Sequence, residues 1–142
     1  MQRKRLMFIC TGNTCRSQMA EGFARHEAGD RFEVFSCGVM ASRVHSGAIE
    51  AMAQIGIDIS GHTSKQIDPD LLKTMDVIVT VCDNAREHCP VVPPTIQTHH
   101  WSIEDPLYAY GTPYQHQVFE RVRDDIGQRV RALLAALKEK TP

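Results

Sequence analysis

The loop formed by residues 10–17 constrains the fold of this chain more than any other segment. It follows the short apolar run Leu6–Ile9 and reads Cys-Thr-Gly-Asn-Thr-Cys-Arg-Ser, after which a helical pattern begins. Backbone N–H groups of such a loop can converge on one tetrahedral anion, and the helix that follows adds its positive end. The sequence therefore predicts an oxyanion site with a cysteine at its floor, placed where a strand is followed by a helix.

The two ends of this loop have different expected roles. Arg16 offers a planar fork that matches two oxygens of the anion. The same positive surroundings favour the thiolate of Cys10, which is the nucleophilic form. Ser17 is expected to donate to that sulfur or to cap the helix, Gly12 to permit a positive φ, and Asn13 to tolerate the left-handed region. The competing interpretation is a chance match with an inert Cys10. The expected oxyanion-binding residues are Thr11, Gly12, Asn13, Thr14, Cys15, Arg16 and Ser17.

Length and charge restrict the class of protein. The 142 residues suit one domain spanning 1–142, and a net charge of −1 gives no general attraction to nucleic acid or membranes. The apolar stretch after the basic N-terminus is too short for a secretory signal, so we expect a cytoplasmic protein. Cysteines stay reduced in that compartment, and the five present here are then a functional signal. We expect a monomer without cofactor or metal.

Apolar runs alternate with helical patterns along the chain. This order predicts an α/β domain with a four-stranded parallel sheet and helices on both faces. Three helical patterns separate the strands, and a long apolar stripe from Val118 to Leu137 predicts a C-terminal helix. The expected strands are Leu6–Ile9, Phe32–Ser36, Val77–Val81 and Ile96–Trp101, and the expected helices between them are Ser17–Ala28, Ala48–Ile55 and Pro69–Thr74.

Three chemically capable residues follow three of these strands. Parallel sheets place their functional sites beyond the carboxyl ends of the strands. Cys10 follows the first strand, Cys82 the third and Asp105 the fourth. We therefore expect these residues to meet, although they are far apart in the sequence.

A second pair of thiols, Cys82 and Cys89, is separated by seven positions. In a helix their Cα atoms would lie about 10.5 Å apart, whereas a disulfide requires less than about 7 Å. A bond between them would need this segment to unwind, which suggests a redox-driven conformational change. Two alternatives are that both are inert structural residues, or that Cys10, Cys15, Cys82 and Cys89 bind zinc. Zinc is disfavoured because the gap between Cys82 and Cys89 is wider than the usual spacing of zinc ligands, and because tight binding would occupy the nucleophile.

The whole chain resembles the thioredoxin-coupled arsenate reductases, which share the fold of the low-molecular-weight protein tyrosine phosphatases. The matching residues are Cys10–Glu21, Cys82 with Cys89-Pro90, Pro93-Pro94 and Asp105-Pro106. The resemblance implies that Cys10 attacks arsenate, that Arg16 holds its oxygens and that Asp105 protonates the departing oxygen. It further implies that Cys82 attacks Cys10, arsenite leaves, Cys89 captures Cys82, and thioredoxin reduces the final disulfide.

The alternative function is a phosphatase acting on phosphotyrosine or a small phosphoester, because phosphate and arsenate are both tetrahedral. The related phosphatases have aromatic residues after Asp-Pro, whereas Leu107 follows here. They also do not need the pair Cys82 and Cys89. A non-catalytic anion-binding or redox-sensing module is the third option, and the presence of a nucleophile, an arginine and an acid argues against it.

The resemblance also implies residues that support the anion loop. In one branch of the reductases, residues matching Asn13, Glu21, Ser36 and an acidic position hold a potassium ion. Lys65 occupies the acidic position here. We therefore expect the Lys65 ammonium to replace the ion, bonding Glu21 and supporting Asn13. The seven histidines are expected to be structural or surface residues, and Cys15 and Cys37 to be packed in the core.

Overall fold

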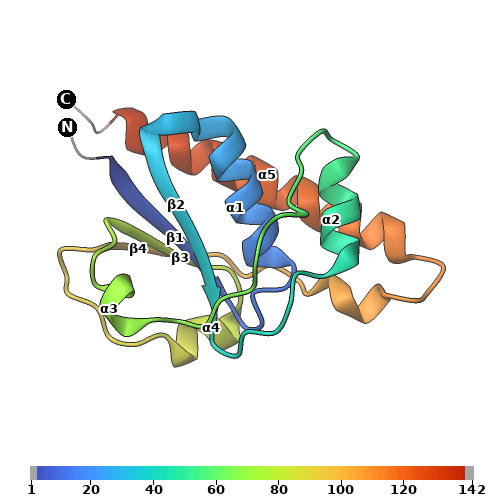
Figure 1. Cartoon of the computed structure of the whole chain (residues 1–142), viewed down its shortest axis with the longest axis horizontal. Coiled ribbons are helices and arrows are strands. Elements are labelled where there is room, and N and C mark those ends of the chain that lie inside the picture. Colours follow the sequence, from blue (N-terminus) through green and yellow to red (C-terminus); the bar gives the residue numbers. More distant parts are fainter. Residues whose placement is uncertain (1–2, 140–142) are drawn as a thin grey trace.

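A computed structural model of the protein describes residues 3–139. Its centre is a four-stranded parallel sheet in the order β2-β1-β3-β4 (Figure 1). The fold class predicted from the sequence is thereby confirmed. The strands are β1 (Lys4–Cys10), β2 (Phe32–Gly38), β3 (Val77–Thr80) and β4 (Gln97–His100).

The observed strands lie where the apolar runs predict them, with ends that differ by one or two residues. Every residue of β3 and most of β1 are buried, as expected for strands covered on both faces. The edge strand β4 is only partly buried. Position 38 pairs with Cys10, so the end of β2 lies directly beside the start of the anion loop.

The larger helices lie on one side of the sheet and two short ones on the other (Figure 1). The first group is α1 (Arg16–Ala28), α2 (Ser46–Ala53) and α5 (Gln115–Glu139), and the second is α3 (Pro69–Leu72) and α4 (Asp83–His88). The apolar stripe of α5 is buried, which confirms the expected C-terminal helix. Gly127 in that helix is explained by packing: a Cβ there would lie 2.8 Å from the ring of Phe23 in α1.

Two single-turn 3₁₀ segments have no clear signal in the sequence. One, Gly29–Arg31, connects α1 to β2, and the other, Pro106–Ala109, follows Asp105. The second is capped by Asp105, whose carboxylate accepts a hydrogen bond from the N–H of Leu107 at 3.0 Å. It therefore fixes the backbone next to the predicted acid. No helix within residues 3–139 is long and apolar enough to cross a bilayer.

Candidate active site

The carbonyl groups of the anion loop are bound from outside the loop, one after another. The carbonyl of Cys10 accepts from the N–H of Val39 at 3.1 Å, and that of Thr11 from Met40 at 2.8 Å. The remaining acceptor–donor pairs are Gly12 with the N–H of Ser42, Asn13 with the Gln18 amide, Thr14 with the N–H of His45, and Cys15 with the N–H of Met19. In a trans peptide the C=O and the next N–H point in opposite directions. The N–H groups of residues 11–16 are therefore directed toward the centre of the loop.

The sulfur of Cys10 lies among donors at that centre. The N–H of Asn13 donates to it at 3.2 Å, and the hydroxyl of Ser17 lies 2.7 Å from it. Asn13 has a φ of 51°, as the sequence predicts for a residue that tolerates the left-handed region. The matching expectation for Gly12 is wrong, because its φ is not positive. The loop thus turns at Asn13, with the thiol held beneath the converging N–H groups.

Gly38 is a loop-supporting residue that the sequence analysis missed. A Cβ at this position would lie 2.6 Å from the carbonyl oxygen of Thr11 and 2.7 Å from the nitrogen of Asn13. Real Cβ contacts are essentially never this short, so only glycine allows β2 to approach the loop. Its N–H and carbonyl bond to the backbone of Lys65 and Ile67, which ties segment 65–67 to the same place.

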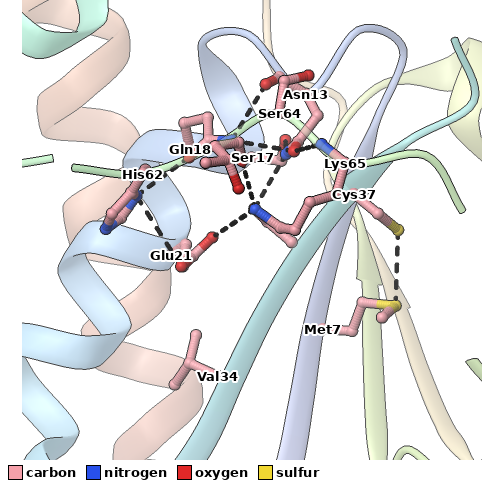
Figure 2. Close-up of polar contacts among 12 residues, drawn as sticks. Met7, Asn13, Ser17, Gln18, Glu21, Val34, Cys37, His62, Ser64 and Lys65 are labelled. Atoms are coloured by element: carbon pink, nitrogen blue, oxygen red, sulfur yellow. Dashed lines mark hydrogen bonds and ion pairs between the residues drawn. The ribbon is translucent and has the colours of Figure 1, made fainter. Parts of the chain in front are cut away.

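A buried chain of hydrogen bonds determines which atom donates to Cys10. Figure 2 shows three of its members, Glu21, Asn13 and Ser17. The Glu21 carboxylate only accepts, so the Ser36 hydroxyl donates to it at 2.5 Å. Ser36 therefore accepts from the amide nitrogen of Asn13 at 2.9 Å, and the other amide hydrogen of Asn13 goes to Ser17 at 2.8 Å. The hydroxyl hydrogen of Ser17 then remains for the sulfur of Cys10.

Cationic groups surround Glu21, which is itself buried. Arg25 donates to it at 2.7 Å, and the Lys65 ammonium lies 3.8 Å away. The expected contact between Lys65 and Glu21 is thus present. The support for Asn13 comes from the Lys65 backbone instead, because its N–H donates to the Asn13 side-chain oxygen at 2.8 Å. His62 lies 3.9 Å from Glu21, and burial lowers its pKa below the ordinary value.

Arg16 and Asp105 face each other at the mouth of the loop. Their nearest charged atoms are 3.8 Å apart, and Arg16 also donates to the carbonyl of Ile103 at 2.9 Å. The neighbouring acid, Glu104, is bound instead by Arg121 at 2.8 and 3.0 Å, and these bonds hold its pKa below the usual range. Of the two adjacent carboxylates, Asp105 is therefore the one placed beside the anion loop.

Cys82 contacts the anion loop through Thr11. The Thr11 hydroxyl lies 3.3 Å from the sulfur of Cys82 and accepts from the Asn84 amide at 3.0 Å. The N–H of Ala85 donates to the same sulfur at 3.4 Å, so Cys82 caps α4. The segments that follow β1, β3 and β4 therefore do meet at one edge of the sheet.

Cys89 lies at the other end of α4 and does not contact Cys82. It is half-buried beside Pro90, Val91 and Val92, in a groove of about 380 Å³ that also borders β4. Burial raises its pKa above the ordinary value. The six residues of α4 separate the two thiols, so a disulfide between them requires this helix to unwind.

The remaining thiols, Cys15 and Cys37, are buried. Desolvation raises the pKa of Cys15 to about 12 and that of Cys37 also to about 12. The Cys37 thiol donates to the sulfur of Met7 at 3.7 Å (Figure 2). Both are in the core, as the sequence predicts. No three cysteine, histidine or carboxylate side chains between residues 3 and 139 lie close enough together to hold a metal ion.

Two exposed tyrosines follow Asp105, although Leu107 directly follows Asp-Pro. Tyr108 and Tyr110 are 63% and 51% exposed. Tyr110 stacks edge-on against His45, with ring centroids 4.5 Å apart, and the N–H of His45 holds the carbonyl of Thr14. Leu107 alone therefore does not separate this chain from the phosphatases, because Tyr108 and Tyr110 follow one and three residues later.

Comparison with known proteins decides the family. The family described as low molecular weight phosphotyrosine protein phosphatase matches residues 5–142. This chain belongs to that family. Members differ in chemistry, and the chain is 46% identical over 132 residues to the arsenate reductase of Bacillus licheniformis, covering 92% of this chain and 95% of the relative.

Solved structures of two arsenate reductases have a fold similar to that of this chain. An arsenate reductase in the phosphate-binding state is 38% identical, with a TM-score of 0.75 and coverage of 94% of this chain and 98% of the other. A thioredoxin-dependent arsenate reductase of Corynebacterium glutamicum is 26% identical, with a TM-score of 0.76, and covers 98% of this chain and 64% of the other. The family fold thus carries arsenate reductases as well as phosphatases.

Proposed function

We propose that this protein reduces arsenate to arsenite and thereby serves in arsenic detoxification. The observation that carries the proposal is the contact at 3.3 Å between Thr11 of the anion loop and the sulfur of Cys82. Phosphate ester hydrolysis needs one thiol, whereas a two-electron reduction needs a second thiol near the first. The named arsenate reductases of similar sequence support the same conclusion.

The first step is the attack of the Cys10 thiolate on arsenic. A sulfur–arsenic bond forms while one arsenic–oxygen bond breaks, and that oxygen leaves as water with a proton donated by Asp105. Arg16 and the N–H groups of residues 11–16 hold the other oxygens. The hydrogen bond from Ser17 stabilises the thiolate before it attacks.

The second step moves two electrons from sulfur to arsenic. The Cys82 thiolate attacks the sulfur of Cys10, and the electron pair of the sulfur–arsenic bond stays on arsenic, which leaves as arsenite. Cys89 then attacks Cys82 and releases the Cys10 thiolate. The resulting Cys82–Cys89 disulfide lies nearer the surface, where the dithiol of thioredoxin can reduce it. The thioredoxin-dependent relative supports this choice of donor.

Cysteine variants test this order of events. Cys10→Ser should abolish arsenite production, and Cys82→Ser should stop it after arsenate has reacted with Cys10. Cys89→Ser should release about one arsenite per protein and stall as a Cys10–Cys82 disulfide, visible by mass mapping. Cys37→Ala, which changes a thiol outside the site, is the matched control. Continued turnover of Cys89→Ser with thioredoxin would exclude the three-thiol relay.

A phosphatase is the second candidate, favoured by the exposed rings of Tyr108 and Tyr110, which follow Asp105 closely in the sequence. They could flank the ring of an aryl phosphate while Cys10, Arg16 and Asp105 perform the displacement. Cys82→Ser separates the two activities, because it removes arsenite release and leaves hydrolysis of an aryl phosphate intact. Hydrolysis that exceeds arsenate reduction in the unmodified protein would make the phosphatase the principal function.

Lys65 is proposed to supply the positive charge that a potassium ion would otherwise provide beside the loop. Its ammonium faces the buried Glu21 at 3.8 Å (Figure 2). Replacing potassium by sodium at constant ionic strength should then leave arsenate turnover unchanged, and Lys65→Asp should introduce a dependence on potassium. A severalfold loss of wild-type activity in sodium would contradict this role.

The remaining assignments are part of the same proposal. We infer a cytoplasmic, monomeric protein of one domain that needs neither a cofactor nor nucleic acid. A net charge of −1 and the thiol chemistry support this environment. Size-exclusion chromatography with light scattering tests the monomer, and a dimer mass would overturn it.

A further inference from the structure

One imidazole bridges Thr80 and Asp83, which lie on either side of Cys82 in the sequence. The Nδ1 atom of His100, in β4, lies 2.7 Å from the hydroxyl of Thr80, and its Nε2 atom lies 2.8 Å from the carboxylate of Asp83. The hydroxyl of Ser102 donates to the same carboxylate oxygen at 2.7 Å. Thr80 ends β3 and Asp83 begins α4. We call Thr80, Asp83, His100 and Ser102 the β4 latch.

The donor directions within the β4 latch follow from Asp83. Its carboxylate only accepts, so His100 carries its hydrogen on Nε2 and donates it. In the neutral ring the Nδ1 atom then carries no hydrogen and accepts from the Thr80 hydroxyl. That contact is much shorter than the 3.5 Å between the same hydroxyl and the carbonyl of His99, so we place the hydroxyl hydrogen on the imidazole. The β4 latch is a continuous chain in which each donor has an acceptor.

The β4 latch fixes the backbone on both sides of Cys82. The N–H of Trp101 also donates to the carbonyl of Thr80 at 2.8 Å, which holds this strand end on β4. On the opposite side, Asn84 and Cys82 itself both contact the hydroxyl of Thr11. The Cys82 end of α4 is therefore bound both to β4 and to the anion loop.

The Cys89 end of α4 is held differently. The His88 side chain bonds back to the carbonyl of Asn84 within the helix, at 2.9 Å. Cys89 and Val92 are half-buried and pack against the hydrophobic core. Val91 is 95% exposed. The helix is thus anchored at its first turn and held by apolar contacts at its last.

We propose that Asp83 and His100 are positioning residues of the thiol relay: they keep Cys82 facing the anion loop while α4 unwinds from its Cys89 end. The inference rests on the proposed relay. When Cys89 attacks the Cys10–Cys82 disulfide, the sulfur–sulfur bond to Cys10 breaks and one to Cys89 forms. Only Cys89 has to travel in this step. Cys82 stays in place for the next reduction.

The test measures the two exchange steps separately. Reduced protein is mixed with stoichiometric arsenate, without thioredoxin, and the thiols are trapped over time and mapped by mass. Asp83→Ala removes the acceptor of both His100 and Ser102. It should slow formation of the Cys10–Cys82 disulfide about fivefold or more, because losing one well-placed hydrogen bond already has about that effect. Formation of the Cys82–Cys89 disulfide from it should be unchanged or faster, because the anchor of the helix is gone.

Two variants separate positioning from general destabilisation. Asp83→Asn keeps an oxygen that accepts from both His100 and Ser102, so it should restore most of the first rate. Asp68→Ala is the matched control, because Asp68 is likewise an exposed acid bonded at the start of a short helix, away from the thiols. It should change neither step. If Asp83→Ala leaves the ratio of the two rates within about twofold of wild type, the β4 latch has no positioning role.

A second measurement does not depend on the variants folding. Nitrogen NMR of the unmodified protein should show His100 as the Nε2–H form, both in the reduced state and after oxidation to the Cys82–Cys89 disulfide. Loss of that signature on oxidation would overturn the proposal, because the latch would then open with the helix. Failure of the relay itself would be recognised differently, because wild-type protein would then form no Cys10–Cys82 disulfide with arsenate.

Discussion

At the scale of single residues, the cysteines differ in the groups that surround them. Cys10 lies among N–H and hydroxyl donors, whereas burial removes Cys15 and Cys37 from water and raises the pKa of each to about 12. Near pH 8 only about one in ten thousand of such thiols is ionised. Cys15 and Cys37 are therefore chemically distinct from Cys10.

Iodoacetamide labelling of reduced protein near pH 8 should divide the cysteines accordingly. Cys89, which is half-exposed, should be modified in the native protein, while Cys15 and Cys37 should stay unmodified until urea unfolds the chain. Peptide mass mapping before and after addition of urea is the measurement. Modification of Cys15 in the native state at a rate similar to Cys89 would show that the anion loop opens far more than its hydrogen bonds suggest.

Gly38 makes a second prediction at this scale. Gly38→Ala places a methyl group within 2.7 Å of the Asn13 nitrogen, so the loop must move and its N–H groups lose their common focus. Affinity for inorganic phosphate, measured by calorimetry, should fall by about tenfold or more, which corresponds to about 1.4 kcal/mol. Gly61→Ala, at a position with open space, is the control. Equal affinities of the two variants would disprove the close-contact argument.

At the scale of elements, the predictable parts of the fold are those set by local pattern. The apolar run Leu6–Ile9 predicted a strand buried on both faces, and the stripe of α5 predicted a helix buried on one face, because each segment's own pattern of apolar residues indicates its burial. The six residues of α4 carry no comparable periodicity. The conformation of the anion loop also depends on donors from residues 39–45 and on Gly38, which reach it through the fold. The error at Gly12 has this cause: distant contacts determine where the loop turns.

The start of α2 depends on the protonation of one histidine. The Nδ1 atom of His45 accepts from the N–H of Gly47 at 3.0 Å, which requires the neutral ring. Burial, followed by the charge of Arg43, lowers the pKa of His45 in the folded state. The unfolded chain therefore binds this proton more readily, and folding stability contributed by His45 is lost as the pH falls below about 6.5.

His45→Asn isolates this effect, because asparagine caps a helix without titrating. Urea unfolding at pH 7.5 and at pH 5.5 should show a smaller loss of stability in the variant than in the wild type. The direction follows from the lowered pKa: the wild type is destabilised on acidification, and the variant lacks that contribution. The same loss in both proteins would mean that protonated His45 keeps the cap.

At the scale of the whole molecule, the anion site is a junction of segments from most of the chain. The loop after β1 is bound by residues 39–45 and by segment 64–67, while Arg16 reaches the segment after β4 and Thr11 reaches α4. The rule that parallel sheets place their functional sites beyond the carboxyl ends of the strands predicted that the segments after β1, β3 and β4 meet there. It could not predict His62 or Asn84, because each reaches the site through a partner that is far away in the sequence.

An anion held at this junction should stabilise the entire fold, because a ligand that binds only the folded state adds its binding free energy to the stability. Inorganic phosphate at about one hundred times its Kd contributes about 2.7 kcal/mol. For a chain of this size, that should raise Tm by roughly 5–10 °C, measured by calorimetry at constant ionic strength. Arg16→Ala should lose most of the shift, because it removes the fork that binds two oxygens, whereas the exposed Arg31→Ala should keep it. A similar shift in Arg16→Ala would mean that phosphate acts as a general salt, and the anion loop would then not be the site where binding and folding are coupled.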